Sequence, residues 1–264
     1  MSRAGATPPG TSITEVAEAL LGARRDRRPI DARPLATALH AADDAYAVQA
    51  RVAAGLAAVA ADAFPRFWKS GGPSRTAVPT HAPLPPEGVW RSPADGSRWP
   101  ANLRLIEVEI AFRLGRPVTP QDAAALRFDD AAAWVDAMAV SIEWVDSRWQ
   151  QGPETPALLK LADLQSHGAL VLGEWLPFAP RDWASQRVQV QIGAQPLFEA
   201  QGAHSMGDPL FVLPAWLRHA TRNGQTAPTG TVVTTGTWCG MLPAQAGDRV
   251  TARFPGIGEA ELQL

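Results

Sequence analysis

The sequence predicts an α+β protein in which a helical region precedes a β-rich one. Three observations support this prediction. The first quarter carries apolar residues at helical spacing, residues 65–100 are rich in proline and glycine, and the residues after Pro100 change to the two-residue alternation of β-strands. With 264 residues, the chain is long enough to bury about 70–75% of its unfolded surface, as one large domain or as a small domain attached to a larger one.

Three helices are expected in the first quarter of the chain. Residues 1–10 are small and polar with paired prolines, and we expect them to form a disordered tail. Residues 12–15 match a capping box, which predicts that a helix begins there. A second helix is expected to begin within residues 31–39. A third is expected over residues 43–63, because the larger apolar side chains fall largely on one side.

From Pro65 to Pro100 we expect a long surface loop, because prolines and glycines recur throughout it. Its tryptophans indicate that the loop is packed. The chain is therefore divided into a tail (residues 1–10), a helical region with this Pro/Gly-rich loop (residues 11–85) and a β-rich domain (residues 86–264).

Strands and two inserted helices are expected after Pro100. The expected strands are residues 103–112, 139–145, 169–172, 186–192, 197–199, 232–235, 249–254 and 260–264. The expected helices are residues 120–138 and 209–221.

Charge and cysteine content limit the possible functions. The chain has 24 basic and 26 acidic residues, which argues against a general nucleic-acid binder, because such proteins need a basic face. Its only cysteine, Cys239, cannot form an internal disulfide. No apolar run approaches the roughly 18 residues of a membrane helix, and the N-terminus lacks the layout of a signal peptide. We therefore expect a cytoplasmic protein that does not bind membranes.

Two glutamates on one expected strand suggest a metal site. Glu107 and Glu109 are two residues apart, so their side chains point the same way, within a run that is otherwise apolar. A buried pair of carboxylates needs a cation, and a hard divalent ion with oxygen ligands would supply it. Glu143, on another apolar strand, offers a third carboxylate for Mg²⁺ or Mn²⁺. Glu-x-Glu alone is a weak motif, and a solvent-exposed strand edge is the alternative.

Residues 106–112, Ile-Glu-Val-Glu-Ile-Ala-Phe, resemble the Glu-x-Glu-Ile-Ala strand of the fumarylacetoacetate hydrolase superfamily. More narrowly, the chain is similar to the branch of 2-keto-4-pentenoate hydratases and 4-oxalocrotonate decarboxylases. Further segments agree with that branch in order and spacing: residues 142–148, 161–173, 202–217 and 232–248. The resemblance covers about residues 40–264.

The resemblance implies a mixed β-roll core as the catalytic domain, preceded by the N-terminal helical region. It also implies that Glu107, Glu109 and Glu143 bind Mg²⁺ or Mn²⁺, which chelates a 2-oxo acid. Lys69 matches the lysine of the family's Lys-x-Gly segment, which serves the active site, so the Pro/Gly-rich loop would be an active-site loop. Because Lys69 follows Phe67-Trp68, we expect apolar walls around its ammonium and a lowered pKa.

Three further residues are candidates for catalysis. Asp163 and Ser166, in the segment that resembles the family's Ala-Asp-Asn-Ala-Ser motif, are candidates for positioning water or relaying a proton. His167 is a candidate acid or base, with a structural histidine as the alternative. Leu164 and Trp238 depart from the family pattern, so we expect an altered substrate pocket.

The implied function is a metal-dependent hydratase of 2-hydroxy-2,4-dienoates, of the 2-keto-4-pentenoate type, in the catabolism of aromatic compounds. Its partner would be a small 2-oxo or 2-hydroxy-dienoic acid, and we expect a homo-oligomer. Decarboxylation of a 2-oxo-3-enedioate is the first alternative. Hydrolysis of an acylpyruvate is less expected, because the surroundings of His81 do not match the family's hydrolase motif. A divergent, non-catalytic paralogue is the last alternative.

Overall fold

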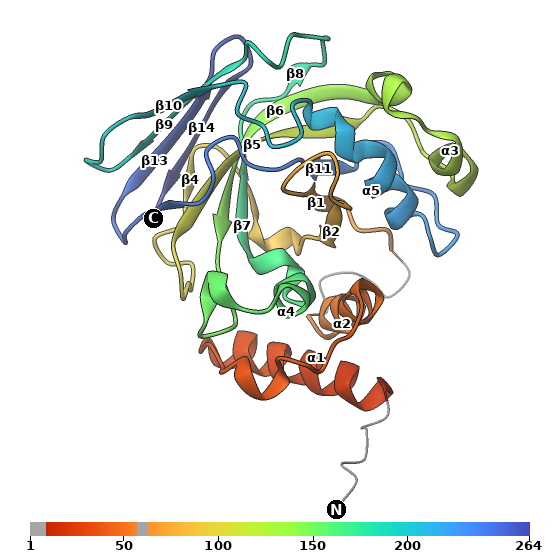
Figure 1. Cartoon of the computed structure of the whole chain (residues 1–264). Coiled ribbons are helices and arrows are strands. Elements are labelled where there is room, and N and C mark those ends of the chain that lie inside the picture. Colours follow the sequence, from red (N-terminus) through yellow and green to blue (C-terminus); the bar gives the residue numbers. More distant parts are fainter. Residues whose placement is uncertain (1–8, 57–62) are drawn as a thin grey trace, which may run out of the picture.

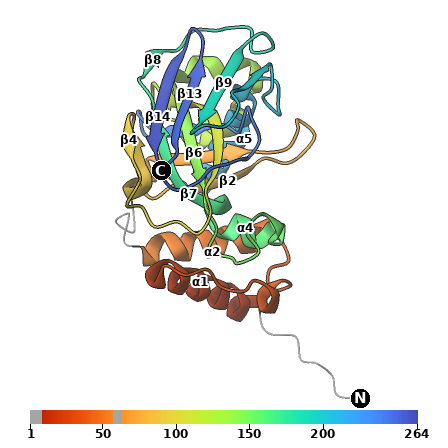
Figure 2. The ribbon, with the colours of Figure 1, turned by 90° about the vertical axis from the view of Figure 1, so that its left-hand side faces the viewer.

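The computed structural model describes residues 9–56 and 63–264, and it has the predicted α+β architecture. Its centre is a curled nine-stranded sheet, with a five-stranded sheet on one side and α-helices on the others (Figure 1). Two N-terminal helices form a layer below the sheets (Figure 2). The predicted β-roll with an N-terminal helical region is confirmed.

The strands of the larger sheet come from distant parts of the chain. In sheet order they are β2 (Thr80–Pro83), β1 (Phe67–Gly71), β11 (Val232–Thr234), β5 (Leu105–Leu114), β6 (Val135–Val145), β7 (His167–Leu172) and β3 (Val89–Arg91), with β12 (Leu242–Pro243) paired to β5 and β8 (Leu176–Pro177) paired to β6. The smaller sheet contains β10 (Phe198–Gln201), β9 (Arg187–Ile192), β13 (Arg249–Phe254), β14 (Gly258–Gln263) and β4 (Ala94–Asp95).

The central pair β5 and β6 is buried almost throughout. Both strands are rich in Val, Ile and Ala, which suits strands covered on both faces. The main core lies around them and includes buried aromatic side chains from the sheets, from α5 and from a loop: Phe112, Trp144, Trp216, Trp238 and Phe254.

Three of the five helices form a second, smaller core. They are α1 (Pro9–Asp26), α2 (Ala42–Gly55) and α4 (Ala157–Ala162), whereas α3 (Pro120–Ala125) and α5 (Leu213–Ala220) pack in the main core. Val16 and Leu20 of α1 pack with Val48 and Val52 of α2 and with Leu159 of α4. This cluster attaches the N-terminal helices to the segment that follows β6.

The structure corrects the expectations for the first 63 residues. Residues 1–8 of the expected tail lie outside the described residues, but Pro9 and Gly10 already belong to α1, so the capping box at residues 12–15 lies inside a helix. The expected second helix is only a 3-10 turn, Arg33–Leu35. The expected third helix ends at Gly55, and residues 57–62 lie outside the described part.

Two further expectations, for the Pro/Gly-rich stretch and for the helix after it, were wrong. The stretch from Pro65 to Pro100 contains β1, β2, β3 and β4, so Lys69 lies on a strand and not in a loop. The helix expected over residues 120–138 is only α3, followed by a 3-10 segment (Phe128–Trp134) and the first residues of β6. The boundary at residue 85 stays a prediction, although β1 and β2 pair within the larger sheet.

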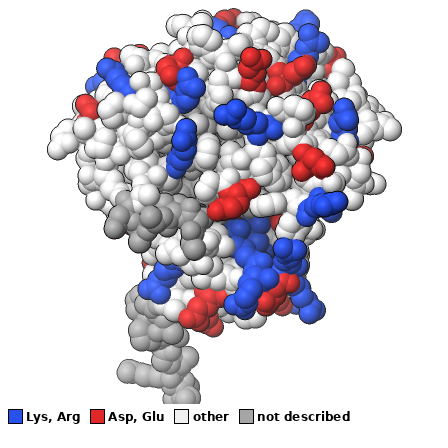
Figure 3. All heavy atoms as spheres, turned by 180° about the vertical axis from the view of Figure 1, so that it is seen from behind, with Lys and Arg blue, Asp and Glu red and all other residues white. Residues whose placement is uncertain are grey.

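The surface carries both signs of charge. Seen from behind, basic and acidic side chains are interspersed over the body, and basic ones gather near the N-terminal helices (Figure 3). Within the described residues, no helix is both long enough and apolar enough to cross a membrane.

Candidate metal centre and active site

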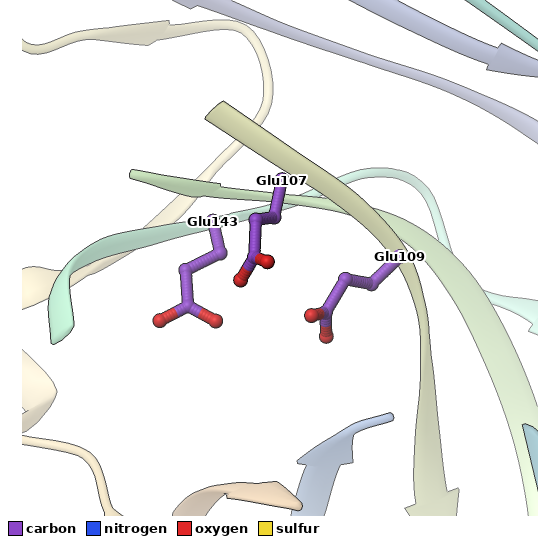
Figure 4. Close-up of side chains that lie close together, drawn as sticks. All are labelled: Glu107, Glu109 and Glu143. Carbon is purple, nitrogen blue, oxygen red and sulfur yellow. The ribbon is translucent and has the colours of Figure 1, made fainter. Parts of the chain in front are cut away.

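Three glutamates meet on one face of the central strands. Glu107 lies opposite Glu143 in the antiparallel register of β5 and β6, and Glu109 follows two residues later on the same face of β5. One oxygen of each carboxylate lies within 4.8 Å of the others. The three side chains point into one space (Figure 4). The strand geometry therefore brings the three predicted metal ligands together.

Burial makes this cluster electrostatically unusual. It raises the pKa of Glu107 to about 8, with neighbouring carboxylates adding to the rise. It also raises the pKa of Glu109 to about 7, helped by Glu143, although Thr234 donates a hydrogen bond to Glu109. Burial favours a raised pKa for Glu143 too, but Lys69 and His167 lower it below its usual value. The carboxylates repel one another and are short of positive charge.

Lys69 is the cation within the cluster. Its Nζ lies 2.5 Å from Glu143 Oε1 and donates to the Gln165 carbonyl at 3.2 Å. Burial alone would lower the pKa of Lys69, but the three carboxylates raise it above its usual value. The expected lowering of this pKa was wrong, because carboxylates and not only apolar walls surround the ammonium.

The donor set fits a hard divalent cation. Glu143 Oε2 is buried and has no hydrogen-bond partner among the described residues, so one oxygen of the cluster is left for another ligand. Three carboxylates face one ammonium, and a divalent ion would neutralise the remaining charge. Neither histidine nor cysteine belongs to the group, which suits Mg²⁺ or Mn²⁺ better than zinc.

A cavity of about 520 Å³ opens onto this cluster. Lys69, Glu107 and Glu109 line it, together with Ser166 and Gln165. Another part of its wall is apolar and is formed by Leu103, Val145, Leu158, Leu161 and Met241. The cavity can therefore hold a small molecule with one polar end at the carboxylates.

The predicted catalytic residues lie at different depths. Ser166 lines the cavity. His167 is buried, with Nδ1 3.4 Å from Glu143 Oε1, and burial lowers its pKa. Asp163 is fully buried and does not line the cavity, and its carboxylate pairs with Arg148 and Arg24 at 2.8 and 3.0 Å. The structure thus places Ser166 in the wall of the same cavity as Glu107 and Glu109, His167 against Glu143, and Asp163 in a separate ion-pair network.

A left-handed turn shapes this part of the site. Leu164, Gln165 and Ser166 have φ of 50°, 55° and 59°, a conformation that costs non-glycine residues about 1 kcal/mol or more each. The turn directs the Gln165 carbonyl to Lys69, and the Gln165 amide donates to Thr80 at 2.6 Å. Sequence reasoning missed Gln165 as a site residue, although the departure from the family motif at this point was a signal.

The two departures do not reshape the cavity directly. Leu164 and Trp238 are each 1% exposed and neither lines the cavity. Trp238 packs against Trp183 and Phe254 in the main core. Neither side chain forms part of the cavity wall, and the expectation of an altered pocket stays a prediction.

The fumarylacetoacetate (FAA) hydrolase C-terminal family matches residues 61–264. Among curated proteins, the chain is similar to a TodF product hydratase of Pseudomonas putida, at 30% identity over 155 residues (58% of this chain and 56% of that protein). It is also similar to a 2-hydroxyhexa-2,4-dienoate hydratase of Comamonas testosteroni, at 31% identity over 168 residues (60% and 59%). The matches span less than three-fifths of the length of these relatives.

Among solved structures, the fold is similar to that of 4-oxalocrotonate decarboxylase from Pseudomonas putida G7, complexed with magnesium and adipate. The TM-score is 0.82 at 20% identity, over 98% of each chain. Fumarylpyruvate hydrolase from Pseudomonas aeruginosa, in complex with Mn²⁺ and pyruvate, gives 0.56 at 14% identity, over 75% of this chain and 88% of that one. These similarities confirm the fold.

Proposed function

The chain belongs to the fumarylacetoacetate hydrolase family, and we propose that it is a metal-dependent hydratase that adds water to 2-hydroxy-2,4-dienoates. The observation that carries this proposal is the convergence of Glu107, Glu109, Glu143 and Lys69 beside one cavity. The two similar curated proteins are both hydratases, which supports water addition as the reaction.

The proposed cofactor is Mg²⁺ or Mn²⁺, held by the carboxylates of Glu107, Glu109 and Glu143. When bound, the ion would supply Lewis-acid polarisation to the oxygens of a 2-oxo acid. The orphaned Glu143 Oε2 and the all-oxygen donor set support this assignment.

The proposed reaction has two stages. The enol proton leaves the C2 oxygen and a proton is added at C5, which converts the dienol to the conjugated 2-oxo-3-enoate. Water then adds at C4, and a proton ends on C3, which gives the 4-hydroxy-2-oxo acid. Negative charge develops on the C2 oxygen when the enol loses its proton and again when water adds at C4, and the ammonium of Lys69, which lines the cavity, would stabilise it.

The other polar residues have supporting roles in this proposal. Ser166 lines the cavity and would position the attacking water. His167 would hold the Glu143 carboxylate in place through its Nδ1 contact. Asp163 would act as a positioning residue, because Arg148 and Arg24 occupy its carboxylate. His81 does not line the cavity and contacts Ser70, so nothing here favours a hydrolase.

The experiment is a turnover assay. The protein is incubated with Mg²⁺ or Mn²⁺ and 2-hydroxypenta-2,4-dienoate, and the loss of dienol absorbance is followed together with product analysis. We expect turnover that depends on the metal and stops with a chelator. No turnover with either ion, on this substrate or on its dicarboxylate analogue, would contradict the proposal. The homo-oligomeric state and the cytoplasmic location stay predictions.

A further inference from the structure

Both lysines of the chain line the same cavity. Of the 24 basic residues, only Lys69 and Lys160 are lysines, and the other 22 are arginines. Lys69 lies at the glutamates, and Lys160 belongs to α4. Among the described residues, no arginine or histidine lines this cavity. Lys160 is therefore the second cation of a cavity that otherwise offers only Lys69.

The charge of Lys160 is not neutralised by a carboxylate. Its Nζ donates to the carbonyl of Pro153 at 2.7 Å, and none of the ion pairs in the described part of the chain includes it. Lys69, in contrast, is paired with Glu143. A partly exposed ammonium at a cavity wall, held by one carbonyl, still has donors available for an anion.

Apolar side chains line the same cavity as the two lysines. Leu158 and Leu161 of α4 contribute to this wall with Leu103 and Met241. Such a surface suits the carbon chain of a ligand, whereas a second carboxylate on that chain would be costly there without a cation. Lys160 supplies that cation.

We propose that Lys160 binds a carboxylate at the far end of the substrate, and that the preferred substrate is a 2-hydroxydienoate with a second, terminal carboxylate. The inference rests on the proposed function, in which the other end of the substrate lies at the three glutamates and Lys69. In this proposal Lys160 determines which substrate binds. It does not determine the reaction, because a dicarboxylate of this kind can undergo either water addition or loss of CO₂.

The test compares two substrates of equal chain length in the presence of Mg²⁺. 2-Hydroxyhexa-2,4-dienoate ends in a methyl group, and 2-hydroxyhexa-2,4-dienedioate ends in a carboxylate. We expect Lys160→Met to lower the ratio of kcat/KM for the dioate over the methyl-ended substrate about tenfold, mainly through KM, and Lys160→Arg to restore most of it. Arg187→Met, at the exposed first residue of β9 and outside the cavity, is the matched control and should keep the wild-type ratio.

A binding measurement separates failure of this inference from failure of the proposed function. Calorimetry with the Mg²⁺-loaded protein compares 2-oxoadipate with 2-oxohexanoate, which needs no turnover. We expect wild type to bind the dicarboxylate more tightly, and Lys160→Met to lose that difference. If wild type binds both equally, or if Lys160→Met weakens both equally, Lys160 does not recognise a far-end carboxylate. If binding behaves as expected but neither substrate turns over, the proposed reaction is wrong and the site for a dicarboxylate stands.

Discussion

Glu109 is the proposed metal ligand at which substitution has the clearest consequences. Its carboxylate is buried beside Glu143, and this burial raises its pKa to about 7. At pH 9, above the raised pKa values of Glu107 and Glu109, we expect Glu109→Gln to raise the melting temperature of the metal-free protein, because one repelling charge is gone. Mg²⁺ at 100 times its Kd should stabilise wild type against unfolding by about 2.7 kcal/mol, which raises its melting temperature. The same variant should lose this rise.

The measurement for Glu109 is thermal unfolding with and without Mg²⁺. Glu259→Gln is the matched control, because Glu259 is exposed on β14 and lies outside the cavity. The control should keep the wild-type response to Mg²⁺. An unchanged response in Glu109→Gln would mean that the ion binds elsewhere.

A substitution of Lys69 tests whether its ammonium takes part in the reaction or only balances the charge of the carboxylates. We expect Lys69→Met to reduce kcat by about 10²- to 10⁴-fold, because the developing negative charge on the substrate loses its partner. Metal affinity should be kept or increased, since the ammonium lies beside the proposed ligand Glu143 and would repel a cation. Steady-state kinetics and a Mg²⁺ titration measure the two effects. A parallel loss of rate and affinity would assign Lys69 a structural role.

At the scale of elements, Asp163 joins α4, the segment after β6, and α1. Its carboxylate accepts from Arg148 at 2.8 Å and from Arg24 of α1 at 3.0 Å, and all three groups are largely buried. We expect Asp163→Asn to lower the free energy of unfolding by about 3–5 kcal/mol, because two buried guanidinium groups lose their counter-charge. Turnover per folded molecule should fall less than tenfold. Urea unfolding and active-site-normalised rates provide the measurement. A hundredfold loss of rate with intact stability would instead support a proton relay.

The elements that could be predicted are those whose signal is local. β5 and β6 are long apolar runs, and the two-residue period placed Glu107 and Glu109 on one face of β5. Glu143 was a candidate as an acid on the other apolar strand, and the family resemblance implied that all three meet at one metal site. β1 could not be predicted, because five residues between prolines and glycines carry no period of their own. Its partner β11 is remote in sequence and pairs Lys69 with Thr234. The alanine-rich run before Val135 has helical propensity, but tertiary pairing turns the following residues into strand.

Site residues that depend on tertiary structure were beyond sequence reasoning. Gln165 reaches Lys69 only through a left-handed turn that its residue types do not favour. Lys160 lines the cavity only because α4 packs beside it, which no local pattern indicates. Lys69 was found through its motif, but its carboxylate surroundings, and so the direction of its pKa shift, came from strand pairing.

At the scale of the whole molecule, three histidines make the folded protein less stable as the pH falls. Burial lowers the pKa of His81 and His219 to about 3 and that of His204 to about 4. In the unfolded chain they bind protons below about pH 6.5, while in the folded protein they stay neutral down to about pH 4. The unfolded state therefore binds more protons in this window, and stability falls as the pH falls. Between pH 7 and pH 5 the loss is about 2 kcal/mol for each histidine.

His204 allows this effect to be isolated. Its Nε2 donates to the Thr235 carbonyl at 2.8 Å and its Nδ1 accepts from the Met206 amide at 3.3 Å, so the neutral ring satisfies both contacts. We expect urea unfolding of His204→Gln to lose about 2 kcal/mol less than wild type between pH 7 and pH 5. The raised pKa values of Glu107 and Glu109 act in the opposite direction, but they act equally in both proteins, so the difference between the two curves reports His204 alone. Parallel curves would show that His204 titrates alike in the folded and unfolded states and that acid acts on stability through other groups.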